Sequence, residues 1–326
     1  MEIPSVNLTS FDLDPSFFDT NATFVELESD QGSPVTPAVV VISVIAVLGF
    51  IGNTVMLIAL LMGYKRGWSN TDLFILNVIV IDLVVVSISA PLAVVGQAFP
   101  SFPLGESGCK AVVYFPYFGS VAVPMGVLSL VLNAATQRVF RALCPRWVVY
   151  TALLFIWVVA IHVPIPAIVH ATVTSLQTYG ENVFVCWTVW PGDNKVYDTV
   201  IFALFYALPF LRIVRIAVRR QATGPAGPQE GRRTDILIII MAALFVVMYL
   251  PFYVAHLCFS YGSGYDTMAL ISVSKVGQCL VYLNSALKPL LCACLYDRFR
   301  SAFIPGRGRD GLAGGTGDRG TELGSL

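Results

Sequence analysis

The chain alternates long apolar stretches with short polar segments. Seven of the stretches are long enough to cross the hydrocarbon core of a bilayer, which takes about 20 helical residues. None alternates polar and apolar residues as a membrane barrel strand does. We therefore expect an all-α fold, a bundle of seven transmembrane helices that together occupy a domain over residues 36–295. The helices are placed near residues 36–63, 71–99, 109–137, 148–172, 196–218, 234–259 and 267–295.

Composition and charge extend this picture. The 326 residues are 56% hydrophobic and only 12% charged, which is typical of an integral membrane protein. If the N-terminus lies outside, every arginine falls at or near the inner face, where basic residues gather. We expect a multi-pass protein of the plasma membrane with an extracellular N-terminus.

The two ends of the chain differ in composition. Residues 1–35 carry seven acidic residues and no basic one, with glycosylation sequons at Asn7 and Asn21, and they lack the pattern of a cleaved signal peptide. We predict an extracellular glycosylated tail there. Residues 305–326 are Gly-rich and are expected to form a disordered cytoplasmic tail. Residues 296–304 predict a short amphipathic eighth helix on the inner leaflet, the alternative being a solvated stub.

The cysteines separate by position. Cys109 opens the third helix and Cys186 precedes the fifth, both on the oxidising side, so we expect a disulfide between them. Four others lie within helices, where a cysteine is a small apolar packing residue, and we expect neither a metal site nor a cofactor. These four are Cys258, Cys279, Cys292 and Cys294.

A set of landmarks in chain order resembles the rhodopsin-like G-protein-coupled receptors. These are Gly52-Asn53, "LNVIVID" ending at Asp82, the Cys109/Cys186 pair, Trp157, Pro209, Pro251 and Pro289. The resemblance implies an extracellular ligand and a heterotrimeric G protein as partner. "LNSALKPLL" followed by "LYDRFRSAF" is most similar to receptors for peptides, of the somatostatin, opioid and galanin kind. Chemokine-type receptors are an alternative, because an acidic outer tail attracts a basic protein ligand. A monoamine ligand is disfavoured, since Pro116 stands where aminergic receptors carry an aspartate.

Lys288 departs from the resemblance. The helix-seven motif of the family, Asn-Pro-x-x-Tyr, reads Lys-Pro-Leu-Leu-Cys here, from Lys288 to Cys292. The resemblance places Lys288 opposite Asp82, and an unpaired cation at mid-membrane costs about 3 kcal/mol. We predict a Lys288–Asp82 ion pair in place of a sodium ion. The alternative is that Lys288 snorkels to the inner interface beside Asp297.

The inner half of the bundle departs from the family as well. The Asp-Arg-Tyr motif of helix three corresponds to Gln137-Arg138-Val139 by local pattern, or to Asn133-Ala134-Ala135 by spacing from Cys109. We favour the first, which makes Arg138 and Arg141 the residues facing a G protein. Tyr249 stands in for the family's switch tryptophan, or is a plain core residue. The expected switch and core polar residues are Asn53, Asp82, Tyr249, Pro251, Asn284, Ser285, Lys288 and Pro289.

The resemblance also implies a ligand cleft that opens outward between helices two, three, five, six and seven. Its expected lining residues are Gln97, Tyr117, Trp187, Asp198, His256, Lys275 and Gln278. His256 is favoured because it lies five residues past Pro251 on the same helix, and its protonation would make binding pH-sensitive.

The sequence is compatible with two functions. The first is a signalling receptor for a peptide or small protein, coupled to a heterotrimeric G protein. The second is a decoy, scavenging or heteromer-partner receptor, which the altered motifs favour. A transporter or an enzyme would need more ionisable groups within the membrane or a catalytic constellation, and we expect neither. Membrane lipids are expected partners and nucleic acid is not.

Overall fold

The computed structural model describes residues 37–62, 67–139, 145–178, 181–192, 194–223, 229–261, 267–296 and 299. Within these residues, seven helical spans are long and apolar enough to cross a membrane, which confirms the predicted bundle. The sequons at Asn7 and Asn21 and the tail over 305–326 lie outside the described residues.

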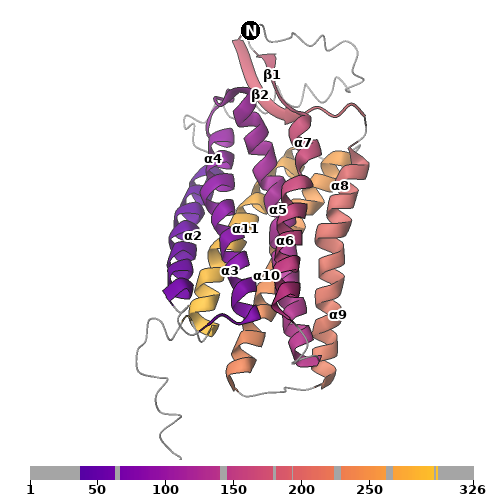
Figure 1. The fold of residues 1–326 in the computed structure, drawn as a ribbon. Coiled ribbons are helices and arrows are strands. Elements are labelled where there is room, and N and C mark those ends of the chain that lie inside the picture. The colour runs from indigo at the N-terminus through magenta and orange to yellow at the C-terminus, as the bar shows by residue number, and fades with distance from the viewer. Residues whose placement is uncertain are drawn as a thin grey trace, which may run out of the picture.

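Four spans are single helices and three are built from consecutive segments. The first, third, sixth and seventh spans are α2 (Pro37–Met62), α5 (Gly105–Val139), α10 (Gln229–Tyr261) and α11 (Thr267–Leu295). The second consists of α3 (Asn70–Val84), η3 (Val85–Ser89) and α4 (Ala90–Ala98). The fourth consists of α6 (Arg146–His162) and α7 (Ile165–Val169), and the fifth of α8 (Lys195–Phe202), η4 (Ala203–Ala207) and α9 (Leu208–Thr223). Figure 1 shows the spans standing side by side.

The segments η3 and η4 are single π-helical stretches, and each ends two residues before a proline, Pro91 or Pro209. A proline ring clashes with the carbonyl four residues earlier and supplies no backbone donor. The wider π-helical turn accommodates that clash without ending the span. The second and fifth spans therefore stay continuous across their prolines.

A β-hairpin lies at one end of the bundle and projects beyond it (Figure 1). Its antiparallel strands, β1 (Ala171–Thr178) and β2 (Glu181–Thr188), place Val173 opposite Cys186. The expected disulfide is present and joins Cys186 to Cys109 in α5. This hairpin was not predicted from the sequence, and the fourth helix, predicted to reach residue 172, ends with α7 at Val169. The turn at Val163 and Pro164 ends α6, and the β-branched run that follows favours a strand.

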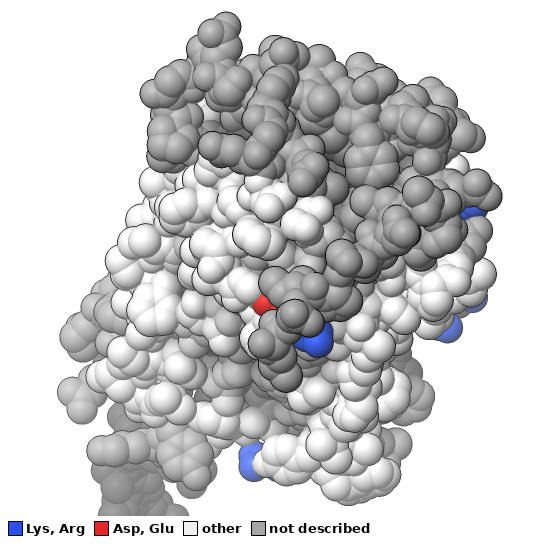
Figure 2. All heavy atoms as spheres, turned by 90° about the horizontal axis from the view of Figure 1, so that it is seen from above, with Lys and Arg blue, Asp and Glu red and all other residues white. Residues whose placement is uncertain are grey.

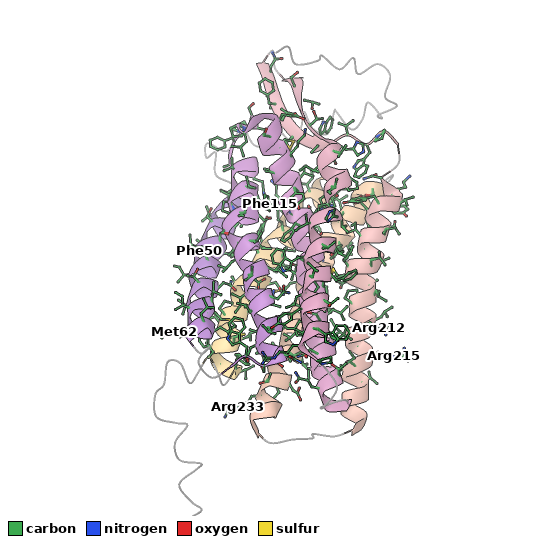
Figure 3. The ribbon with its side chains drawn as sticks, viewed as in Figure 1. Phe50, Met62, Phe115, Arg212, Arg215 and Arg233 are labelled. Carbon is green, nitrogen blue, oxygen red and sulfur yellow. A yellow bond between two sulfur atoms is a disulfide. The ribbon has the colours of Figure 1, made fainter. Side chains whose placement is uncertain are left out.

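The outer surface of the bundle is apolar, as expected for contact with lipid. Phe50 and Met62 on α2 are exposed and point away from the other helices (Figure 3). Arg212, Arg215 and Arg233 lie toward the end of the bundle opposite the hairpin. Seen from above, the described residues of the hairpin end present few charged side chains (Figure 2).

The predicted eighth helix is not shown. After α11 ends at Leu295, only Tyr296 and Phe299 of the segment 296–304 are described. Tyr296 is buried and Phe299 packs against the main hydrophobic core, so the chain just after α11 returns to the bundle.

The sixth and seventh spans approach each other closely at Gly277 of α11. A Cβ atom added to Gly277 would lie 2.7 Å from the backbone nitrogen of Phe252 and 3.1 Å from the carbonyl carbon of Pro251. Backbone atoms cannot rotate away as a side chain does, so any larger residue must push α10 and α11 apart.

We expect Gly277→Ala to destabilise the protein by about 1–3 kcal/mol, because it overpacks this contact. The matched control is Gly96→Ala in α4, where an added Cβ would meet its nearest neighbour, Val112 Cγ1, at 3.6 Å. That control is expected to melt at or slightly above the wild-type temperature. We would measure the melting temperatures of both purified variants in detergent and compare them. Equal melting temperatures would contradict the predicted close contact.

Candidate functional site

A buried carboxylate, that of Asp198, lies near the hairpin end of the bundle. Asp198 belongs to the first turn of α8 and is only 7% exposed. Its Oδ1 accepts a hydrogen bond from the Tyr117 hydroxyl at 3.3 Å, and its Oδ2 accepts one from Asn194 Nδ2 at 3.0 Å. The Ser260 hydroxyl of α10 also donates to Oδ2. Three spans, the third, fifth and sixth, are therefore joined through one acid.

A narrow cavity adjoins this carboxylate. Tyr117, Asp198 and His256, three of the residues predicted for the ligand cleft, line it together. The His256 ring lies 4.4 Å from the Phe252 ring and 5.9 Å from the Tyr117 ring, measured between centroids. Phe252 and Tyr253 add aromatic surface to the lining. The cavity thus combines one acid, one imidazole and several aromatic rings.

The remaining predicted cleft residues lie apart from this cavity. Gln97 Nε2 donates to Gln278 Oε1 at 2.7 Å, and Gln278 lines a second cavity that shares Ser120 and Phe252 with the first. Trp187 lies on β2 beside Cys186, and its buried indole nitrogen has no hydrogen-bond partner among the described residues. Lys275 is half-buried on α11 and lines neither cavity.

Two polar residues of the site, Asn194 and Ser260, were not predicted from the sequence. Each lies one helical turn from a residue that was predicted, Asn194 before Asp198 and Ser260 after His256. Residues four apart share a helix face, so this spacing could have drawn attention to both. Ser260 Oγ also donates to the His256 carbonyl at 3.0 Å.

The predicted ion pair between Lys288 and Asp82 is present. Lys288 Nζ lies 2.7 Å from Asp82 Oδ1, with the lysine 2% exposed and the aspartate fully buried. The alternative, in which Lys288 snorkels to the inner interface, is wrong. The pair joins the second span, through α3, to the seventh, α11.

Several other residues that were expected in the polar core are also buried in the bundle. Asn53 Nδ2 donates to the carbonyls of Gly49 and Ser285, which ties α2 to α11. Asn284 and Ser285 are buried, and Tyr249 packs against Phe245 with ring centroids 5.1 Å apart. The landmark Trp157 donates from Nε1 to Asn77 Oδ1 at 2.9 Å.

A polar cluster closes the end of the bundle opposite the hairpin. Asn133 and Gln137 of α5 each donate to Thr71 Oγ1 at 3.2 Å. Asp72, which caps α3 together with Ser69, accepts a hydrogen bond from the Tyr296 hydroxyl. Helix α5 runs through both candidate replacements for the Asp-Arg-Tyr motif. The side chain of Arg138 and the whole of Arg141 lie outside the described residues, so both alignments stay predictions.

The similarity to known proteins extends over nearly all of the helical bundle. Residues 52–291 match the sequence model of the family described as "7 transmembrane receptor (rhodopsin family)". Galanin receptor 2b of Danio rerio is 29% identical over 296 residues, covering 85% of this chain and 76% of the relative. Galanin receptor type 1 of Mus musculus is 28% identical over 286 residues, covering 81% and 79%. Neuropeptide FF receptor 1 of Homo sapiens is 26% identical over 317 residues, covering 87% and 73%.

Proposed function

The chain belongs to the rhodopsin family of seven-transmembrane receptors, and from that premise we propose that it is a cell-surface receptor for an extracellular peptide. The observation that carries the proposal is the similarity to galanin and neuropeptide FF receptors across four fifths of the chain. That similarity includes the spans that hold Tyr117, Asp198 and His256. A cavity with aromatic walls and a few polar groups suits the end or one side chain of a peptide.

The proposed orientation places the hairpin outside and the arginine-rich end in the cytoplasm. Arg212, Arg215 and Arg233 lie toward one end, as the enrichment of cytoplasmic ends in basic residues predicts. The acidic tail over residues 1–35, glycosylated at Asn7 and Asn21, would then face the ligand. In this arrangement, ligand binding shifts the bundle between two states and opens its inner end to a heterotrimeric G protein.

A second function is favoured by one specific observation, the Lys288–Asp82 ion pair. The pair links α3 to α11 inside the bundle and opposes any movement that separates these helices. A receptor locked in this way would bind ligand without activating a G protein, as a decoy, a scavenger or a heteromer partner. The two functions therefore differ in the response of the inner end, not in the ligand cavity.

G-protein activation distinguishes the two functions. Galanin and neuropeptide FF are applied as probe peptides to membranes that hold equal surface amounts of wild type, Lys288→Asn and Arg138→Ala, with a panel of Gα subunits. A signalling receptor is expected to activate at least one Gα above background, in the basal state or with a probe, and Arg138→Ala is expected to abolish that activity. Silence of the wild type with activity in Lys288→Asn would favour the locked receptor.

A further inference from the structure

The charge of Asp198 has no counter-charge within the described part of the chain. Its hydrogen-bond partners, Tyr117, Asn194 and Ser260, are all neutral groups, and it forms no ion pair with any of the residues that the structure describes. Neutral donors reduce the cost of burying a carboxylate but do not cancel its charge. An ionisable residue held in this way within a membrane span marks a functional site.

Among the buried carboxylates of the described residues, Asp72, Asp82 and Asp198, a contrast with Asp198 is given by Asp82. Asp82 lies against Lys288 Nζ at 2.7 Å, so its charge is matched inside the bundle. Around Asp198, the nearest lysine along the chain is Lys195, and its Nζ lies 5.9 Å from the centre of the Tyr261 ring. Lys195 does not line the cavity, whose lining includes one basic side chain, that of His256.

We propose that Asp198 binds a cationic group of the ligand, an ammonium or guanidinium that enters the cavity between α5, α8 and α10. This inference rests on the proposed function, since it names the chemistry of the ligand for the same cavity. The carboxylate can exchange its bonds from Asn194 or Ser260 for charge-assisted N–H donors, which bind more strongly. Tyr117 and Phe252 supply ring surface against which a cation is stabilised further.

The narrowness of the cavity limits what enters it. Its volume of about 10 Å³ has room for about one water-sized group. A ligand cation must therefore widen the cavity by moving side chains, and only the end of one side chain or a peptide terminus is small enough to enter. Both an α-ammonium and a basic side chain carry the required charge. The experiment therefore tests each source of the cation separately.

The test measures the thermal stabilisation of the purified full-length receptor by small probes, because a ligand that binds the folded state raises its melting temperature. Nα-acetyl-argininamide and Nα-acetyl-lysinamide present side-chain cations, and glycinamide presents only an α-ammonium. Nα-acetyl-citrullinamide is the neutral control for the arginine probe. We expect at least one cationic probe to raise the melting temperature and citrullinamide to leave it unchanged. Equal shifts from argininamide and citrullinamide, or no shift from any cation, would overturn the proposal without the use of a variant.

Two variants assign the effect to Asp198. Asp198→Asn keeps the size and one acceptor oxygen, replaces the other oxygen by an NH2 donor and removes the charge, and it is expected to weaken binding of the cationic probe about tenfold or more. Asp198→Glu keeps the charge and is expected to keep most of the binding. Tyr114→Phe removes one hydrogen bond, that to the Ile161 carbonyl, and no charge, and Tyr114 lines neither cavity, so it serves as the matched control. A probe shift that persists in Asp198→Asn would place the cation elsewhere and overturn the proposal.

The cation site and the proposed function can be rejected independently of each other. A cation-dependent shift in a receptor that activates no Gα would keep the subsite and favour the decoy function. Activation by a probe peptide that Asp198→Asn leaves unchanged would keep the receptor function and overturn the subsite.

Discussion

Lys288→Met and Asp82→Asn are each expected to reduce the amount of folded receptor at the cell surface sharply, whereas the double variant recovers much of it. Each single variant strands one buried charge, at a cost of about 3–5 kcal/mol. The double variant removes both charges, so the remaining cost is that of the lost packing. The expected coupling between the two positions is therefore several kcal/mol, among the largest effects that two substitutions in this chain can show.

The measurement is a double-mutant cycle on surface amount and on the melting temperature of the purified receptor. The matched control combines Lys288→Met with Asp198→Asn. Lys288 donates to Asp82, whereas Asp198 accepts from Tyr117 and Asn194, so these two positions belong to separate hydrogen-bond groups. Costs at positions that do not interact add to within about 0.5 kcal/mol. A double Asp82/Lys288 variant as damaging as the sum of its singles would show that the ion pair contributes nothing.

A charge swap tests the same contact in another way. Asp82→Lys with Lys288→Asp restores one charge of each sign across the 2.7 Å contact, although the side-chain lengths are exchanged. We expect the receptor with both substitutions to be more stable than a receptor that carries only Asp82→Lys or only Lys288→Asp. This outcome separates an ion pair from a general need for polar side chains at the two positions.

The helices themselves could be predicted from the sequence because lipid imposes a simple rule on them. A backbone that crosses the membrane must satisfy its own hydrogen bonds, so a long apolar stretch is a helix. The spans α2 and α11 accordingly begin and end within about one residue of the predicted 36–63 and 267–295. Outside the membrane that rule no longer applies, which is why the hairpin of β1 and β2 was missed.

The polar contacts divide in a similar way. The Lys288–Asp82 pair was predictable because a charge at mid-membrane demands a partner and the chain offers few. The hydrogen bonds from Asn194 and Ser260 to Asp198 were not, since they depend on how three helices pack around one another. The grouping of Tyr117, Asp198 and His256 came from the family resemblance, whereas Trp187 and Lys275 lie outside the cavity that those three share.

Removal of the Cys109–Cys186 disulfide is expected to have the second large effect. The bond joins two residues that are 77 positions apart in the sequence. For a loop of this length, the loss of chain entropy in the unfolded state corresponds to about 4.5 kcal/mol. It also fixes β2 to the start of α5. The remaining ties between the hairpin and the bundle include the hydrogen bond from Phe102 N–H to the Phe184 carbonyl and that from Val173 N–H to Glu106.

Three variants and one reagent measure this contribution. Cys109→Ala, Cys186→Ala and the double variant all break the same bond, so we expect three nearly equal falls in melting temperature rather than additive ones. Cys279→Ala, which removes a half-buried free cysteine of α11, is the control and is expected to change the melting temperature little. A reducing agent is expected to lower the wild-type melting temperature toward that of the variants and to leave theirs unchanged. Additive effects of the two single substitutions, or a wild type indifferent to reduction, would mean that the hairpin is held by its hydrogen bonds and packing rather than by the disulfide.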